Sequence, residues 1–580
     1  MVMTWRGKTI VDLARSFIDT NGAPQQTDIH VTVPPGGADW FEQTAAEQAG
    51  IAGFAAALST GLASLSGCSR RGLAERFDST IGAGTVLLPF GGSRQLTPEE
   101  GMAALIPTAG TQTTDACSLM TYGFDPDLSS YSPYHGATWA VIESLARLAA
   151  IGGDAARARL TFQEYFRRLA TPEDWGQPLA ALLGAFRTQL ACGTAAIGGK
   201  DSMSGTFRDL HVPPTLVSFA VGIGRARRVL SAALDCPDRA VYLLPVPPDA
   251  ARPGLQLPDC QAFMSNLDHV RALNEAGGLS AAATVRRNGA AVACARMCFG
   301  NNLGFTFADR PLIDLFRPQP GALVLAVKSA EAETILRSLG AQLLGHTTRE
   351  PVLVFGRETL TVQDALAAWE KTLEPVFPTR ADLERLKPVL PPQPKEKPHA
   401  GKEAKLPVQM ARPLWRRPRP AVFIPVFPGT NCEYDSTRAF SLAGAEPDLL
   451  VVRNNTPQAI LETINEMSRR IRKAQIIMLP GGFSAGDEPE GSGKFIAAVF
   501  RNPLLAEAVH ELLDRRDGLI LGICNGFQAL VKLGLLPYGR ICNLDVDSPT
   551  LTFNRIGRHM SRTVTTRVES IRSPWLQLCR

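Results

Sequence analysis

The stretch 386–420 constrains the fold more than any other part of this chain of 580 residues, because it divides the chain in two. It reads LKPVLPPQPKEKPHAGKEAKLPVQMARPLWRRPRP, in which proline and basic residues leave no apolar periodicity. Such a composition predicts a semi-rigid, extended linker. The density of prolines favours a solvated spacer over a tail that binds nucleic acid. We therefore expect chemically different regions on the two sides of the linker.

The overall composition is that of a multidomain globular protein, with 45% hydrophobic and 20% charged residues. The 60 basic and 55 acidic side chains leave a formal net charge of only +5, so we expect neither nucleic acid nor a membrane as a partner. Eleven cysteines form no CxxC pair and no cluster with histidine, which argues against a disulfide framework or a zinc site. The sequence shows no signal peptide and no apolar stretch of about 18 residues, so we expect a cytoplasmic protein.

The region after the linker alternates short apolar runs with helical patterns. Strands are predicted within 421–427, 449–453, 475–482 and 518–526. The segment TPQAILETINEMSRRIRKA, at 456–474, has a helical pattern. This alternation predicts a doubly wound α/β domain, whose sheet carries the functional groups at its strand ends.

Cys524 lies between glycines in LGICNGFQ, where a predicted strand meets a predicted helix. Small neighbours permit the sharp turn of a nucleophile elbow, the helix amino terminus favours a thiolate, and the backbone N–H of Asn525 can face a developing oxyanion. Gly481, Gly482 and Phe483, in LPGGF at another predicted strand end, provide a second set of candidate donors. A cysteine flanked by apolar residues is generally a small buried residue. The two glycine-rich strand ends favour a nucleophile here.

Three segments together resemble the class I glutamine amidotransferases, and among these the amidotransferase domain of phosphoribosylformylglycinamidine synthase. They are FPGTNCEYDSTRAF at 427–440, PGGFSAGDEPEGSGKF at 480–495 and GICNGFQAL at 522–530. The resemblance implies a flavodoxin-like domain in which Cys524 attacks the side-chain amide of glutamine and releases ammonia. It also implies that glutamine and the oxyanion are bound by Gly481, Gly482, Phe483, Asn525 and Gln528. Cys432, which lacks an elbow, is expected near this site but not as the nucleophile.

In this family the cysteine works with a downstream His-x-Glu pair that supplies the base. The sequence after Cys524 holds one histidine, His559, and no glutamate follows it two residues later. We interpret His559 as an ordinary polar residue. We expect the domain to be cut short before the pair, and we do not expect full glutaminase activity from this chain alone.

The first region has its densest group of reactive residues in AIGGKDSMSG, at 196–205. Glycine amides and Lys200 suit phosphoryl oxygens, and Asp201 suits a hard cation such as Mg²⁺. The segment is not a P-loop, because it lacks the first glycine and Asp201 follows the lysine where Ser or Thr is required. From these residues alone, a polar turn is nearly as good an interpretation.

Several segments resemble the second of the two homologous halves of the formylglycinamidine synthetase, which shares its fold with aminoimidazole ribonucleotide (AIR) synthetase. They are RFDSTIGAG at 76–84, SPYHGATWAVIES at 132–144, GGDAARARLTFQEYF at 152–166, GKDSMSGTF at 199–207 and PPTLVSFAVG at 213–222. The implied fold class is α/β and α+β multidomain. It comprises an AIR-synthetase-like half, with a ferredoxin-like sheet at about 60–130 and a carboxy-terminal α/β domain, followed by the doubly wound amidotransferase domain.

The expected domain boundaries follow from this resemblance. Residues 1–58 would be a segment linking to a preceding half, and 59–225 the AIR-synthetase-like amino-terminal domain. Residues 226–385 would be its carboxy-terminal domain, 386–420 the linker, and 421–580 an incomplete amidotransferase domain.

The resemblance also implies a carbon–nitrogen ligase of purine biosynthesis. ATP would phosphorylate the amide oxygen of formylglycinamide ribonucleotide, and ammonia from glutamine would displace the phosphate, with Mg²⁺ offsetting charge. The nucleotide and substrate would be bound by Asp78, Lys200, Asp201 and Ser202. Asp154 and Glu164 are candidate metal ligands, although a carboxylate at a helix end is more often only solvated.

Two departures from the family leave alternatives open. The stretch Arg287-Asn288-Gly289-Ala290-Ala291 stands where relatives carry an acidic Asp-Gly-Gly motif, so we expect a metal ligand to be lost. The family's first half does not match this sequence, so we expect only one wall of an active site. A partial gene, a split subunit whose partner chain carries the other wall, and a degenerate copy are the alternatives. A non-catalytic fragment or binding module is the alternative hypothesis. Another amidotransferase-coupled ligase is less favoured, because the linker joins a GKDSMSG-type domain rather than a P-loop domain.

Overall fold

The computed structural model divides the chain into two compact units. The residues that it describes are 1–20, 26–33, 39–50, 53–80, 82–108, 113–381, 417–484, 493–551, 553–568 and 573–576. The first unit comprises Met1–Ala74, Asp78–Thr108 and Thr113–Thr379, and the second comprises Glu75–Phe77, Ala109–Gln112 and Arg380–Arg580. Most of the predicted linker at 386–420 lies outside the described residues.

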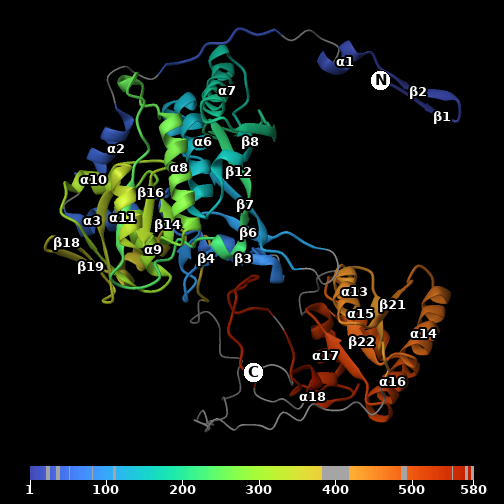
Figure 1. Cartoon of the computed structure of the whole chain (residues 1–580). Helices are drawn as coiled ribbons and strands as arrows, with labels where there is room; N and C mark the ends of the chain where they lie inside the picture. The colour runs from blue at the N-terminus through green and yellow to red at the C-terminus, as the bar shows by residue number, and fades with distance from the viewer. Residues whose placement is uncertain are drawn as a thin grey trace. The chain divides into compact units, whose positions relative to one another are not determined.

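The first unit contains a six-stranded sheet with the order β3-β6-β7-β12-β8-β9. These strands are β3 (Thr85–Leu87), β6 (Met102–Leu105), β7 (Ala116–Gly123), β8 (Arg159–Tyr165), β9 (Ala195–Lys200) and β12 (Thr215–Arg225). Neighbouring strands are antiparallel, except that β8 and β9 are parallel. Helices α6 (Pro133–Ala150) and α7 (Pro172–Cys192) pack beside β12 (Figure 1).

Side chains alternate strictly along β7, as expected of an antiparallel strand with one buried face. Cys117, Leu119 and Thr121 are buried, whereas Met120 and Tyr122 are about two-fifths exposed, at 40% and 41%. The ferredoxin-like sheet expected at about 60–130 is not closed within those residues. Its central position is taken by β12, which pairs with both β7 and β8 and comes from much later in the chain.

A second sheet in the same unit has seven strands in the order β14-β16-β13-β17-β15-β18-β19. They are β13 (Ala240–Leu244), β14 (Leu279–Thr284), β15 (Gly304–Phe307), β16 (Leu323–Val327), β17 (Gln342–Thr348), β18 (Val352–Phe355) and β19 (Glu358–Thr361). All five residues of β16 are buried. Leu323, Leu325 and Val327 join one hydrophobic core, and Val324 and Ala326 join another. The sheet is therefore covered on both faces.

Helices and short elements complete the first unit. They are β1 (Val2–Trp5), β2 (Lys8–Asp12), α1 (Arg15–Thr20), α2 (Trp40–Ala49), α3 (Phe54–Ala63), α4 (Arg71–Ala74), η1 (Gly82–Gly84), β4 (Phe90–Gly91), β5 (Thr97–Pro98), α5 (Pro126–Tyr131), η2 (Ala155–Arg157), β10 (Thr206–Phe207), β11 (Leu210–His211), η3 (Ala226–Arg228), η4 (Pro253–Leu255), α8 (Cys260–Glu275), α9 (Gly289–Phe299), α10 (Leu312–Phe316), α11 (Ala330–Ser338) and α12 (Val362–Lys371). The boundary expected between residues 58 and 59 falls inside α3. Phe54 and Leu58 of this helix are fully buried in the core beneath the second sheet, so α3 belongs to the folded unit.

The second unit has a four-stranded sheet in the order β21-β20-β22-β23, with every pair parallel. The strands are β20 (Ala421–Val426), β21 (Glu446–Val451), β22 (Ile476–Leu479) and β23 (Leu519–Gly522). The other elements are α13 (Glu433–Leu442), α14 (Pro457–Ile471), α15 (Lys494–Phe500), α16 (Pro503–His510), η5 (Glu511–Arg515), α17 (Asn525–Leu533), α18 (Leu535–Tyr538) and η6 (Pro574–Leu576). Helices alternate with the strands, as expected of a doubly wound fold (Figure 1).

These sheets confirm the predicted α/β and α+β multidomain fold class. All four strands predicted in the second region are present, and the predicted helix at 456–474 is α14. The described cysteines are free thiols. Among the helices that the structure describes, none combines the length and the apolar character needed to cross a membrane.

A buried carboxylate joins the two sheets of the first unit. Glu100, between β5 and β6, accepts a hydrogen bond from Thr284 Oγ1 at the end of β14 at 2.8 Å, and its Oε2 lies 2.9 Å from Nε of Arg147 on α6. Arg286 Nη2 lies 3.5 Å from the same oxygen. Burial alone would raise the pKa of Glu100, but Arg147, Arg286 and then Arg296 lower it to about 2.

We expect Glu100→Gln to destabilise the first unit by about 3–5 kcal/mol near neutral pH, because it leaves buried guanidinium groups without their counter-charge. Since the pKa of Glu100 is lowered on folding, its contribution is present above about pH 4.5 and is lost as the pH falls toward 2. Urea unfolding curves at several pH values measure this. Glu275→Gln, which removes an exposed partner of Arg271, is the control and should cost less than about 1 kcal/mol. Equal effects of the two variants would contradict the role of Glu100 as the counter-charge of the buried guanidinium groups.

Candidate functional site

Cys524 lies at the sharp turn between β23 and α17. Its backbone angles are φ 53° and ψ −109°, a combination that residues with a side chain rarely adopt. The residue is exposed, unlike the six described cysteines elsewhere in the chain that are buried. A strained, accessible cysteine at the carboxyl end of a parallel strand has the geometry of a nucleophile elbow.

Glycines permit the close packing that produces this turn. A Cβ placed on Gly526, in the first turn of α17, would lie 2.0 Å from the carbonyl oxygen of Leu479, the last residue of β22. A Cβ on Gly522 would lie 2.7 Å from the backbone of Gly526. The helix therefore approaches the neighbouring strand end without any side chain between them, and Cys524 is held above the sheet edge.

Gly481 brings three parts of the second unit together. A Cβ on this residue would lie 3.4 Å from Cys524 Cβ and 3.3 Å from the sulfur of Cys432, which precedes α13. The loop after β20 is tied to the loop after β22 by two backbone hydrogen bonds: Phe483 N–H donates to Gly429 O at 2.8 Å, and Asn431 N–H donates to Gly481 O at 3.4 Å. The carboxyl ends of β20, β22 and β23 thus converge on one site.

The predicted donor set is only partly available for an oxyanion. The backbone N–H of Phe483 already donates to Gly429, so it is not a free donor, and its side chain is 54% exposed. Within the described part of the chain, the N–H groups of Gly482 and Asn525 have no hydrogen-bond acceptor. These two groups are the donors that the geometry leaves for a developing negative charge.

The side chains of Asn525 and Gln528 are used within the protein. Asn525 is almost fully buried, and its Oδ1 accepts from the backbone N–H of Ser484 at 3.4 Å. Its Nδ2 donates to Gln528 Oε1 at 3.3 Å. Asn525 therefore joins the elbow to the loop after β22, and its side chain has a positioning role there.

One feature of this site went unrecognised in the sequence. Gly429 has φ +90°, and a Cβ on it would lie 2.2 Å from Phe483 O, so glycine permits the contact between the two loops. The signal that could have revealed it is the Pro428-Gly429 turn directly after a strand. Cys432 is held close to Cys524; burial raises the pKa of the Cys432 thiol, and the charges of Asp435, Cys524 and Glu433 raise it further.

The GGKDS segment continues β9 along the edge of the six-stranded sheet in the first unit. Lys200 Nζ lies 5.1 Å from the centre of the Tyr165 ring. Burial raises the pKa of Glu164, and the charge of Asp201 raises it further, so these two carboxyl groups are neighbours. Ser202 donates from its backbone N–H to Glu164 O at 3.0 Å, and its hydroxyl lies 2.9 Å from that of Ser204. The structure therefore brings Glu164 and Asp201 together.

Asp154 does not join this group. Asp154 accepts from Ala156 N at 3.0 Å as the cap of η2, before β8 begins, whereas Glu164 lies at the other end of β8. The strand closest in sequence to Asp78 is β3, and β3 and β9 are opposite edges of the sheet. Among the described residues, no three Asp, Glu, His or Cys side chains cluster as metal ligands. Two carboxylates, Glu164 and Asp201, still match the way Mg²⁺ is held when phosphate oxygens complete its shell.

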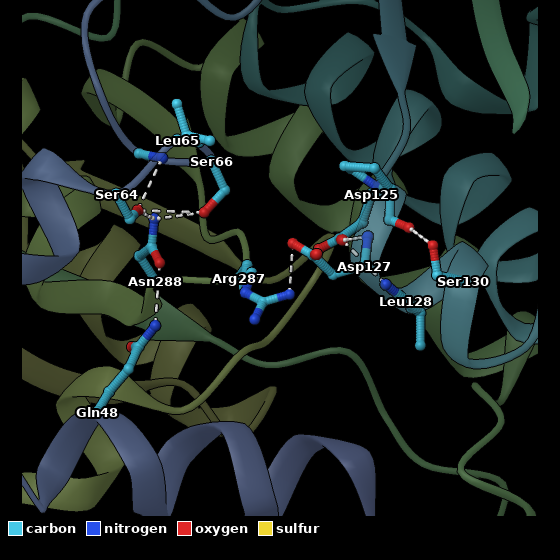
Figure 2. A network of polar contacts seen from close by, with 12 residues as sticks. Gln48, Ser64, Leu65, Ser66, Asp125, Asp127, Leu128, Ser130, Arg287 and Asn288 are labelled. Carbon is cyan, nitrogen blue, oxygen red and sulfur yellow. Dashed lines mark hydrogen bonds and ion pairs between the residues drawn. The ribbon is translucent and has the colours of Figure 1, made fainter. Parts of the chain in front are cut away.

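Figure 2 shows the contacts of Arg287 and Asn288, the stretch where the resemblance led us to expect an acidic motif. Asn288 Nδ2 donates to Ser64 Oγ at 3.0 Å and to Ser66 Oγ at 3.2 Å, and its Oδ1 accepts from Gln48 Nε2 at 3.0 Å. The neighbouring Arg287 pairs with Asp127 at 2.5 Å. The amide of Asn288 is thus committed to hydrogen bonds within the protein, and it carries no charge for a metal.

Comparison with known proteins assigns the second unit. Residues 419–580 match the model of the CobB/CobQ-like glutamine amidotransferase domain. These residues form a glutamine amidotransferase domain. The PurQ subunit of phosphoribosylformylglycinamidine synthase from Dehalococcoides mccartyi is 40% identical over 135 residues, which cover 23% of this chain and 47% of that subunit. The PurQ subunit from Rubrobacter xylanophilus is 34% identical over 160 residues, covering 27% and 58%. The chain spans about half the length of such curated relatives.

The solved structures to which the chain is similar include phosphoribosylformylglycinamidine synthase II from Thermotoga maritima, with a TM-score of 0.42 and 11% identity over 84% of this chain and 79% of that one. PurLQS from the same organism has a TM-score of 0.41 and 14% identity, covering 57% and 55%. The predicted resemblance to a phosphoribosylformylglycinamidine synthase-type protein with a glutamine amidotransferase domain is confirmed.

We expect Gly526→Ala to loosen the amidotransferase domain, because the added methyl group must displace α17 from Leu479; overpacking of this kind costs about 1–3 kcal/mol. Hydrogen–deuterium exchange of peptides from β22 and α17 measures the loss. Gly254→Ala, which adds its methyl group into open space in the first unit, should leave these peptides unchanged. Unaltered exchange in Gly526→Ala would contradict the packing described.

We expect iodoacetamide to alkylate Cys524 faster than Cys432 near neutral pH. Cys524 is exposed, whereas the Cys432 thiol is partly buried and its pKa is raised above 9, which lowers its thiolate fraction. Timed alkylation followed by peptide mass spectrometry gives both rates. The rate at Cys432 should keep rising with pH beyond pH 9. Faster reaction at Cys432 would contradict the conclusion that Cys524 is the more accessible thiol.

Proposed function

We propose that the second unit hydrolyses the side-chain amide of glutamine and releases its nitrogen as ammonia, with Cys524 as the nucleophile. The observation that carries the proposal is the strained elbow of Cys524 beside the Gly481-Gly482 strand end, within a segment that matches the amidotransferase family. The thiol sulfur attacks the side-chain carbonyl carbon of glutamine, and the carbonyl electron pair moves to oxygen. The departing nitrogen takes up the proton that the thiol gives, so ammonia leaves as the tetrahedral intermediate collapses. Water then hydrolyses the resulting thioester to glutamate and restores the thiol.

The backbone donors support this chemistry. The N–H of Asn525 belongs to the first turn of α17, where the helix dipole favours negative charge. The N–H of Gly482 faces no acceptor among the described residues. Together they are proposed to bind the oxyanion, while Asn525 and Gln528 side chains hold the two loops in register.

For the first unit we propose the synthetase reaction: in the cytoplasm, ATP phosphorylates the amide of formylglycinamide ribonucleotide, and ammonia then displaces phosphate to give the amidine. Lys200 would bind phosphoryl oxygens, and Glu164 and Asp201 would hold Mg²⁺, which when bound offsets the charge of the nucleotide. A partner chain that resembles the first synthetase half would complete the site. Asp78 and Ser202 remain candidate substrate contacts. We also propose that the domains of this half meet at 225/226 and that the second of them ends at 385.

A second candidate function is a binding module of the same family that retains ligands without turnover. The observation that favours it is Asn288, whose neutral amide stands in place of a carboxylate and is saturated by Gln48, Ser64 and Ser66.

We expect a diazoketone mimic of glutamine to label Cys524, because the reagent occupies the glutamine site and alkylates the nucleophile there. Intact-mass and peptide spectrometry should find one adduct on the wild-type chain and none on Cys524→Ala. Cys432→Ala is the matched control and should still be labelled at Cys524. Excess glutamine should slow the labelling. Absence of label on the wild-type chain, or label that persists in Cys524→Ala, would refute the nucleophile and leave the binding module as the better hypothesis.

A further inference from the structure

A cavity of about 430 Å³ lies in the first unit between the six-stranded sheet and α9. Much of its wall is apolar or aromatic. The residues of this wall belong to the six-stranded sheet, to α9 and α12, and to the loops beside them. The principal apolar side chains that line it are Leu87, Phe90, Met120, Phe219, Met297 and Trp369. Its volume is within the range of sites that hold small organic ligands.

Charged side chains occupy one part of this wall. Glu99, Glu100, Arg147, Arg286, Arg296 and Arg70 all line the cavity. The two carboxylates are already saturated by other donors. Glu100 accepts hydrogen bonds from Thr284 and forms ion pairs with Arg147 and Arg286. Glu99 accepts from Ala232 N at 2.7 Å and from the Ser231 hydroxyl, and burial raises its pKa to about 7.

Arg296 makes no direct ion pair among the described residues, although the charge of Glu100 acts on it. In the described part of the chain its side chain has neither an ion pair nor a hydrogen bond, and its Nε is a buried nitrogen with no partner. Arg70 also lacks a carboxylate partner there and uses Nη2 to donate to Leu65 O at 3.1 Å. A guanidinium group in a low-dielectric cavity is costly unless an anion approaches it. The pKa of Arg296 is lowered to about 10, first by burial and then by the charge of Arg286.

We propose that this cavity binds a small organic anion, whose carboxylate or phosphate group contacts the guanidinium of Arg296 and whose apolar or aromatic body packs against the apolar wall. The unpaired guanidinium supplies the charge, and its planar donors suit either anionic group. Leu87, Phe219 and Trp369 supply a surface that inorganic ions would not use.

Three probes of one shape test the proposal with the full chain. Benzoate and phenyl phosphate carry the two possible anionic groups on the same ring, and benzamide is a neutral analogue of benzoate. Isothermal titration calorimetry at fixed ionic strength should show that at least one anion binds about tenfold to a hundredfold more tightly than benzamide, as expected for charge-assisted hydrogen bonds. The stronger of the two anions identifies the preferred group.

Arg296→Met should remove this advantage of the anion. Arg349→Met, which removes an exposed arginine in the turn between β17 and β18, is the matched control and should bind as the wild type does. The unfolding midpoint of Arg296→Met should be unchanged or raised in the absence of ligand, because an uncompensated buried charge is removed. Arg296→Lys keeps a cation if the methionine variant does not fold, and should bind the anion with intermediate affinity.

Three results would overturn the proposal. The first is equal affinity for benzoate, phenyl phosphate and benzamide, or no binding of either anion. The second is unchanged anion binding by Arg296→Met. The third is a lower unfolding midpoint of Arg296→Met in the absence of ligand, which would indicate that Arg296 serves stability.

Discussion

The first unit depends on the saturation of one buried carboxylate. Glu100 receives donors from β14, from α6 and from the loop before α9, so both sheets and the helix between them are fixed to a single group. Such an arrangement is specific because each donor would otherwise be buried without its partner. A second buried carboxylate, Glu143, lies 3.4 Å from Arg286. Among the described residues Arg296 makes a direct ion pair with neither carboxylate, because both are already engaged by other groups.

The second unit depends on the absence of side chains. Gly429, Gly481, Gly522 and Gly526 each lie where a Cβ would meet neighbouring atoms, and together they allow three strand ends and one helix to meet. The strained conformation of Cys524 is possible because this surrounding backbone is closely packed. Beside this closely packed elbow, the N–H groups of Gly482 and Asn525 have no acceptor among the described residues.

The sequence predicted those features that depend on local pattern. Apolar runs revealed the strands of the second unit, and glycines around Cys524 revealed the elbow, because both signals lie within a few residues. Features that depend on strand order were not predictable in this way. The separation of β3 from β9 and the position of β12 at the centre of its sheet are consequences of long-range pairing. The hydrogen bond that occupies the Phe483 amide and the unpaired state of Arg296 likewise become visible only when distant segments are placed together.

Charge separates two kinds of site within the first unit. The cavity beside α9 is walled by arginines whose carboxylate partners are saturated, so a divalent cation would be repelled there and an anion attracted. Asn288, which is neutral, adds no negative charge near the start of α9. At the β9 edge the balance is reversed, because Glu164 and Asp201 are neighbours and each favours a cation between them. A metal-dependent phosphoryl transfer therefore has its best electrostatic support at that edge, and the arginine-walled cavity suits a separate anionic ligand.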